Sequence, residues 1–184
     1  MEKLTLKKPL FLCGMMGSGK STIGQILAEK LHVPFHDLDE MIEDEAGISI
    51  PEIFERDGEQ RFRKLERNVL IRESQKIKGV MALGGGSLQH QRIIDHLKIY
   101  GWLVFLDVDQ SVLLKRLQGD SGRPMLKQND EDGTADQNFQ KLLQERRPLY
   151  EQAEITIQAS RQTPAELADS IINKLLIYDA IYSN

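Results

Sequence analysis

The sequence has little of several features that mark specialised classes of protein. It contains one cysteine, Cys13, so no disulfide can form within the chain, and we expect a reducing compartment, the cytoplasm. No apolar run approaches the ~18 residues that span a bilayer, so we expect no membrane partner. The four histidines at 32, 36, 90 and 96 show no metal-ligand spacing with cysteine or carboxylate residues.

Positive charge is not in excess either. Lys and Arg total 24 and Asp and Glu total 28, which gives a formal net charge of −4. A dedicated nucleic-acid-binding domain would usually carry a basic surplus, so we expect no nucleic-acid partner. An anionic small molecule stays compatible with this balance, because a local basic pocket can lie in an acidic protein. The 184 residues, 40% hydrophobic and 28% charged, suit one domain over 1–184.

Short apolar runs alternate with amphipathic stretches along the chain. The predicted strands are 10–13, 34–37, 80–83, 102–106 and 155–157, and the predicted helices are 21–31, 39–46, 49–57, 61–77, 111–117, 139–150 and 164–176. Lysines before the first run resemble the start of a signal peptide, but the run is short and a Gly-rich loop follows at once. This alternation predicts an α/β fold with a mostly parallel sheet covered on both faces, and with ligands at the carboxyl ends of its strands.

The strongest motif follows the first predicted strand. Residues 14–21, Gly-Met-Met-Gly-Ser-Gly-Lys-Ser, match the phosphate-binding P-loop pattern G-x-x-x-x-G-K-[ST]. Glycines let several backbone N–H groups point at one anion, and the next helix adds its positive N-terminal end. Lys20 would neutralise phosphate charge and the Ser21 hydroxyl would bind Mg²⁺. The alternative is a Gly-rich turn with an incidental lysine.

Two acidic residues end the second predicted strand. The carboxylates of Asp37 and Asp39 point to the same side of an extended chain. One could hold Mg²⁺ through water, and the other could orient and deprotonate an acceptor hydroxyl. The alternative for Asp39 is an N-cap, because a helix is predicted to begin there.

Glycines and arginines supply the remaining candidates. Gly84, Gly85 and Gly86 follow a strand directly and suit a place where a ligand touches backbone, although a plain tight turn is the alternative. Arg63, Arg123 and the pair at 146 and 147 could bind anions, or could be ordinary surface charges.

Two further segments have competing interpretations. Residues 119–136 form a long Gly-containing stretch that we interpret as a lid closing over the nucleotide, with its acidic residues forming a solvated face. Asp107, at the end of the fourth predicted strand, could serve as a magnesium-binding aspartate in place of the pair at 37 and 39.

Taken in order, these segments resemble the shikimate kinase family. The P-loop is followed by Asp37-Leu38-Asp39, Asp57-Gly58-Glu59-Gln60-Arg61-Phe62-Arg63, Leu83-Gly84-Gly85-Gly86, Arg123-Pro124-Met125-Leu126 and Arg146-Arg147-Pro148-Leu149-Tyr150. Many unrelated enzymes share a P-loop, whereas this ordered set over 10–175 is highly specific. The resemblance implies a P-loop kinase of the nucleoside-monophosphate-kinase type, with a three-layer fold and a five-stranded parallel sheet in the order 2-3-1-4-5. It implies transfer of the γ-phosphoryl group of ATP to the 3-hydroxyl of shikimate, in aromatic amino-acid biosynthesis.

The resemblance also implies roles for individual residues. The substrate-binding helices would span about 39–77, and the two arginines at 63 and 146 would bind the carboxylate of shikimate. Shikimate would contact Asp39, Arg63, Gly84, Gly85, Gly86 and Arg146. ATP would contact Gly17, Ser18, Gly19, Lys20, Ser21, Thr22, Arg116, Arg123 and Gln162, with Arg116 packing on adenine. Mg²⁺ would be held by Ser21, and by Asp37 through water. Catalysis would fall to Asp39, Lys20 and Arg123, and Arg147 would occupy a variable position and face elsewhere.

Some features leave alternatives open. The stretch between Arg123 and Arg146 is a few residues longer than usual in the family, and we assign no function to 177–184. A P-loop kinase for another small metabolite, such as gluconate or a nucleoside monophosphate, would need different residues at Asp39, Arg63 and the three glycines. A nucleotide-binding regulatory module without catalysis conflicts with intact Lys20, Ser21 and Asp39. We expect a monomer.

Overall fold

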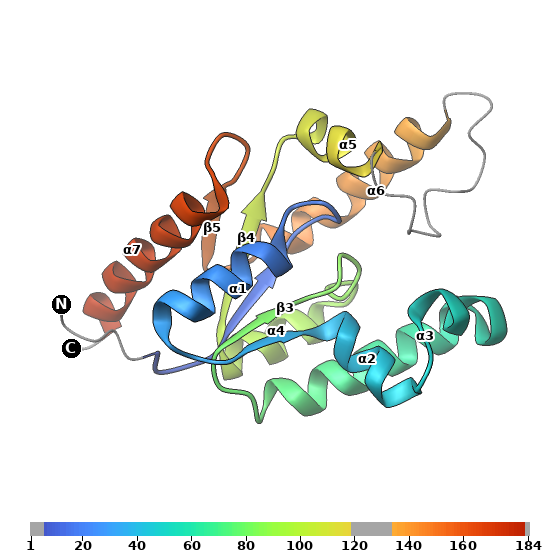
Figure 1. Cartoon of the computed structure of the whole chain (residues 1–184), viewed down its shortest axis with the longest axis horizontal. Helices are drawn as coiled ribbons and strands as arrows, with labels where there is room; N and C mark the ends of the chain where they lie inside the picture. The colour runs from blue at the N-terminus through green and yellow to red at the C-terminus, as the bar shows by residue number, and fades with distance from the viewer. Residues whose placement is uncertain (1–5, 119–133, 183–184) are drawn as a thin grey trace.

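The computed structural model describes residues 6–118 and 134–182 (Figure 1). Its strands are β1 Leu10–Cys13, β2 Phe35–Asp37, β3 Val80–Ala82, β4 Trp102–Asp107 and β5 Ile155–Gln158. Its helices are α1 Lys20–Leu31, α2 Leu38–Ala46, α3 Ile50–Ser74, α4 Gln91–Tyr100, α5 Gln110–Gln118, α6 Thr134–Tyr150 and α7 Pro164–Tyr182. Residues 119–133 of the predicted lid at 119–136, with Arg123, lie outside the described residues.

The predicted sheet is confirmed. The strands pair in parallel in the order β2-β3-β1-β4-β5, with Leu12 of β1 opposite Ala82 of β3 and Val104 of β4. Helices α1 and α7 pack together on one face, and α4 packs on β4 and α3 from the other (Figure 1). Because all five strands run in the same direction, their carboxyl ends and the loops that follow them lie along one edge of the sheet.

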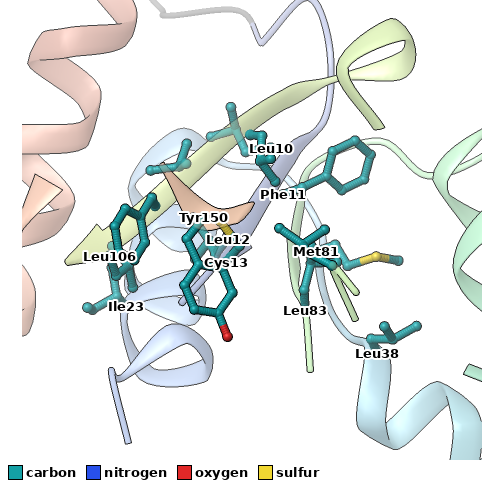
Figure 2. Packing of buried hydrophobic residues seen from close by; sticks show 14 of the residues in the cluster. Leu10, Phe11, Leu12, Cys13, Ile23, Leu38, Met81, Leu83, Leu106 and Tyr150 are labelled. Atoms are coloured by element: carbon teal, nitrogen blue, oxygen red, sulfur yellow. The ribbon is translucent and has the colours of Figure 1, made fainter. Parts of the chain in front are cut away.

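The core lies around the central strand. Leu10, Phe11 and Leu12 of β1 are completely buried and Cys13 is 1% exposed, surrounded by side chains from both layers of helices (Figure 2). A strand covered on both faces is apolar throughout, which explains the continuous run in the sequence. Each such side chain contributes about 1.5–3 kcal/mol when it leaves water. No helix among the described residues is both long and apolar enough to span a membrane.

Several predicted boundaries were wrong. The helix α4 was not predicted, although Ile93, Ile94 and Leu97 bury one face of it. The helices predicted at 49–57 and 61–77 are confirmed as two stretches of α3 separated by a kink at Gly58, whose φ of 77° and ψ of 172° are not helical, but the second stretch ends at Ser74 and not at 77. The lid was predicted to extend to 136, but α6 already begins at Thr134, and the tail beyond 176 continues α7 to Tyr182.

Candidate active site

The predicted P-loop lies between β1 and α1. Gly14 has a φ of 141°, and a side chain there would put Cβ 2.9 Å from the carbonyl oxygen of Leu106. Gly19, the N-cap of α1, has a φ of 88° and no side chain to cap the helix. The loop lines a cavity of about 530 Å³, together with Asp37, Asp39, Arg116 and Gln162 among others. Backbone N–H groups and a helix N-terminus beside a cavity make an anion site.

Lys20 places its charge within this loop. Its Nζ atom donates hydrogen bonds to the carbonyl oxygens of Gly14 and Met15, each at 2.9 Å. The ammonium group therefore lies across the P-loop, close to where a phosphate bound by the loop would need a positive charge.

Asp37 connects the P-loop to the second strand. The Ser21 hydroxyl donates to Asp37 Oδ2 at 2.6 Å, and Asp37 Oδ1 accepts from the backbone N–H of Asp39 at 3.0 Å. Asp37 is therefore the N-cap of α2, and the alternative in which Asp39 is the cap was wrong. Asp39 instead lies in the first turn of α2, where it lines the cavity.

A second, smaller cavity adjoins the first. Its volume is about 310 Å³, and its lining includes Phe54, Arg63, Glu66, Gly86 and Arg146. Met16, Asp39, Gly84 and Gly85 line both cavities. The structure thus brings the predicted acceptor residues together from α2, α3, the loop after β3 and α6, directly beside the P-loop.

Arg63 is held in place by a buried acid that the sequence interpretation missed. Its Nη1 atom donates to Glu66 Oε2 at 2.8 Å, and Glu66 Oε1 accepts from the Ser87 hydroxyl at 2.7 Å. Glu66 is only 4% exposed, so both of its oxygens need such partners. A signal existed, because Glu66 is a charged residue in line with buried Phe62 and Val69 on α3.

The three glycines each have a steric reason. A Cβ on Gly86 would lie 2.7 Å from Arg63 Nη1, and one on Gly84 would lie 2.9 Å from Glu66 Oε1 and 3.0 Å from Asp39 Oδ1. A Cβ on Gly85 would lie 3.2 Å from the backbone nitrogen of Met16. A side chain at Gly84 or Gly86 would require Glu66, Asp39 or Arg63 to move, so glycine at these positions leaves room for the charged groups.

The adjacent arginines at the end of α6 do different things. Arg146 is 6% exposed, lines the smaller cavity and donates from Nη1 to the carbonyl oxygen of Gly85 at 2.9 Å. Arg147 faces away, as predicted, and binds Asp107 through both Nη atoms at 2.9 and 2.8 Å. The hydrogen bonds that Arg147 donates to Asp107 raise the pKa of Arg147.

The carboxylate of Asp107 is bound by protein side chains. Asp107 is buried, and its Oδ2 atom accepts a further hydrogen bond from Gln158 at 2.8 Å. Its carboxylate thus serves to join β4, β5 and α6. The interpretation of Asp107 as a magnesium-binding residue is not supported by these contacts.

The remaining nucleotide candidates lie around the larger cavity. Arg116 of α5 donates to the carbonyl oxygen of Gly17 at 2.9 Å, and Gln162 lies before α7 at the cavity wall. Cys13 lies in the core, and burial raises the pKa of its thiol, which fits the packing role expected for it.

Fold and site together define a class of protein. A P-loop before an amphipathic helix, a basic residue in that loop, and a second cavity that shares its wall and holds two arginines make this a P-loop kinase for a small molecule. Comparison with known proteins narrows the class.

The family model described as shikimate kinase matches residues 16–176. The shikimate kinase of Parasynechococcus marenigrum is 45% identical over 91% of this chain and 86% of its own length. The one from Aquifex aeolicus is 37% identical over 90% and 95%. The chain belongs to the shikimate kinase family.

Comparison with solved structures gives the same family. The shikimate kinase from Acinetobacter baumannii in complex with shikimate superposes with a TM-score of 0.85 at 35% identity, covering 93% of this chain and 94% of that one. A gluconokinase from Sinorhizobium meliloti has a TM-score of 0.55 at 18% identity, which reflects the shared fold alone.

Proposed function

We propose that the chain transfers the γ-phosphoryl group of ATP to the 3-hydroxyl of shikimate, giving shikimate 3-phosphate and ADP. The observation that carries this is the wall shared by the two cavities. A P-loop cavity of about 530 Å³ suits a nucleotide, and the adjoining cavity of about 310 Å³ holds two arginines and borders an aspartate. Shikimate, a small polyol carboxylate, needs cations for its carboxylate and an acceptor for its hydroxyls.

The arginines would fix the orientation of the acceptor. Arg63 and Arg146 line the smaller cavity from α3 and α6. Arg63 lies against Gly86, and Arg146 lies against Gly85. A carboxylate held by two guanidinium groups cannot rotate freely, because each group offers a planar set of donors. The ring hydroxyls would then lie towards Asp39 and the P-loop.

Asp39 would act on the reacting hydroxyl. It lies on the wall common to both cavities, where it would hold the 3-hydroxyl and accept its proton as that oxygen attacks the γ-phosphorus. The bond from the γ-phosphorus to the bridging oxygen breaks, and ADP leaves with that electron pair. Lys20 would stabilise the phosphate charge during transfer. Gly17, Ser18 and Gly19 would contact phosphate from the loop, and Thr22 would do so from the start of α1.

The residues present also fit a magnesium ion. Mg²⁺ prefers hard oxygen ligands and few protein side chains, and Ser21 Oγ and Asp37 Oδ2 lie 2.6 Å apart at the cavity. We propose that these two residues hold it. When bound, the ion neutralises charge on the transferred phosphate.

An ADP-release assay tests this proposal. The purified chain is given ATP and Mg²⁺ with shikimate, gluconate or a nucleoside monophosphate, and ADP is measured by coupled oxidation of a nicotinamide cofactor. We expect turnover with shikimate that exceeds turnover with the other acceptors. Preference for gluconate, or ATP binding without any turnover, would contradict the proposal.

Organisation and location complete the proposal. We propose a single kinase domain over 1–184 that works as a monomer in the cytoplasm. The described residues support one domain because their buried side chains form a continuous hydrophobic cluster. Sedimentation velocity with and without both substrates tests the monomer.

A further inference from the structure

The carbonyl oxygen of Gly85 accepts two hydrogen bonds from the end of α6. One comes from Arg146 Nη1 at 2.9 Å, and the other comes from the hydroxyl of Tyr150. A carbonyl oxygen has two acceptor lone pairs, so this oxygen is fully used. The pair of donors fixes the orientation of the Gly85 peptide, which borders both cavities.

The same hydroxyl also contacts the P-loop. Tyr150 Oη lies 3.6 Å from the Sδ atom of Met15. On the opposite side, Gly85 is pressed against the P-loop, since a Cβ built on it would lie 3.2 Å from the backbone nitrogen of Met16. Tyr150 therefore touches both loops at the place where the two cavities meet.

Tyr150 is itself held firmly. It is 1% exposed, and its ring stacks on Phe105 of β4 with the ring centroids 5.3 Å apart. Figure 2 shows the ring beside the β1 side chains, with the hydroxyl at the outer end of the ring. Burial raises the pKa of Tyr150, so the hydroxyl stays protonated and remains a donor.

We propose that Tyr150 is a positioning residue that sets the alignment of the Gly84–Gly86 loop with the P-loop, and through it the alignment of the acceptor hydroxyl with the transferring phosphoryl group. This inference rests on the proposed function, because it takes the smaller cavity as the acceptor site. Phosphoryl transfer is sensitive to such alignment, since a displacement of about 1 Å can lower the rate by about 100-fold.

Tyr150→Phe removes the hydroxyl and keeps the stacked ring. Its matched control is Tyr178→Phe, because the Tyr178 hydroxyl also donates to a backbone carbonyl, that of Glu154 at 2.7 Å, and its ring also packs on an aromatic neighbour, Trp102. Tyr178 lies on α7 and lines neither cavity. Both variants lose one partly buried hydrogen bond to a backbone carbonyl, so their melting temperatures should fall by similar amounts.

Steady-state kinetics supply the first readout. For Tyr150→Phe we expect kcat to fall about tenfold or more, and KM for shikimate to rise about three- to tenfold, with KM for ATP within about twofold of the parent. For Tyr178→Phe all three constants should stay within about twofold. Equal constants for the two variants would overturn the inference, because a merely structural hydroxyl would change the melting temperature alone.

Amide hydrogen exchange supplies a readout that needs no substrate. The amides of residues 84–86 should exchange about tenfold faster in Tyr150→Phe than in Tyr178→Phe, because the peptide has lost one of its two anchors. Unchanged exchange in this segment would overturn the inference whatever the acceptor. A parent enzyme that releases no ADP with shikimate would instead refute the proposed function, and the exchange comparison would still decide the role of Tyr150.

Discussion

Replacing Arg146 tests the acceptor site most directly. Arg146→Ala should sharply raise KM for shikimate while KM for ATP changes little, because Arg146 lines only the smaller cavity. The fold should survive the change, since the carbonyl of Gly85 keeps the Tyr150 hydroxyl as a donor. The change therefore removes a ligand contact and one of the two donors to the Gly85 carbonyl, and the rise in KM for shikimate reports the first of these.

The expected magnitude follows from burial and charge. Arg146 is 6% exposed, so a carboxylate bound to it is shielded from water. Removing one partner of a charge-assisted hydrogen bond in such a place costs about 2–3 kcal/mol, equivalent to an increase of about 30- to 150-fold in KM. Arg146→Lys should recover only part of this loss, because an ammonium group lacks the planar pair of donors.

The neighbouring arginine is the control. Arg147→Ala should leave KM for shikimate within about threefold of the parent, because the side chain faces Asp107 and not the cavity. Its effect should be on stability, a loss of about 1–2 kcal/mol, since the buried carboxylate of Asp107 keeps only Gln158. Steady-state kinetics and urea unfolding of the three variants separate the two effects.

One pattern of results would refute this reasoning. If Arg147→Ala impairs shikimate binding and Arg146→Ala is mild, the assignment of the two arginines is reversed. If Arg146→Ala raises both KM values equally, the smaller cavity is not a separate acceptor site.

Three further predictions concern the P-loop, the acidic pair and the start of α3. Lys20→Ala should lower kcat by about 100-fold or more without unfolding the protein, and near-normal turnover would contradict the kinase mechanism. Asp39→Asn should lower kcat more than Asp37→Asn at saturating substrates. Added Mg²⁺ should partly restore the activity of Asp37→Asn and not that of Asp39→Asn. An unchanged kcat for Asp39→Asn would exclude a role of Asp39 in the chemical step. Hydrogen bonds at the N-cap of α3 lower the pKa of Glu52 from 4.5, so its charged form contributes stability at neutral pH that is lost as pH falls through this lowered pKa. Glu52→Gln should thus be less stable than the parent at pH 7 and equally stable in acid, which thermal unfolding across pH measures.

Local features were predictable because their causes are local. Glycines with positive φ at 14 and 19 are needed to curl the P-loop, and the pattern that requires them is written in eight consecutive residues. Strand β1 was predictable because a strand buried on both faces must be apolar throughout. The family resemblance added the sheet order, which the structure confirms.

Contacts between distant segments were not predictable from one sequence. Nothing near Glu66 in the chain indicates that Ser87 will bind one of its oxygens, whereas the pairing of Glu66 with Arg63 is a local i,i+3 contact on α3. The kink at Gly58 has a local cause, a φ of 77° that favours glycine, and the predicted break between 57 and 61 reflects it. Helix ends are harder to place, since local propensity is a weak guide to them, and α6 begins at Thr134 rather than 139.

The sequence by itself determined that this chain carries a P-loop, and its ordered motifs predicted the family, which the comparisons confirm. Only the tertiary structure decided what the side chains at the end of α6 touch: Arg146 contacts Gly85, Arg147 contacts Asp107, and Tyr150 lies between the two loops. The reason is physical. A P-loop is made by the conformations of adjacent residues, whereas the acceptor site is made where segments about 60 residues apart meet, and the sheet and the packing of α6 against it set those distances.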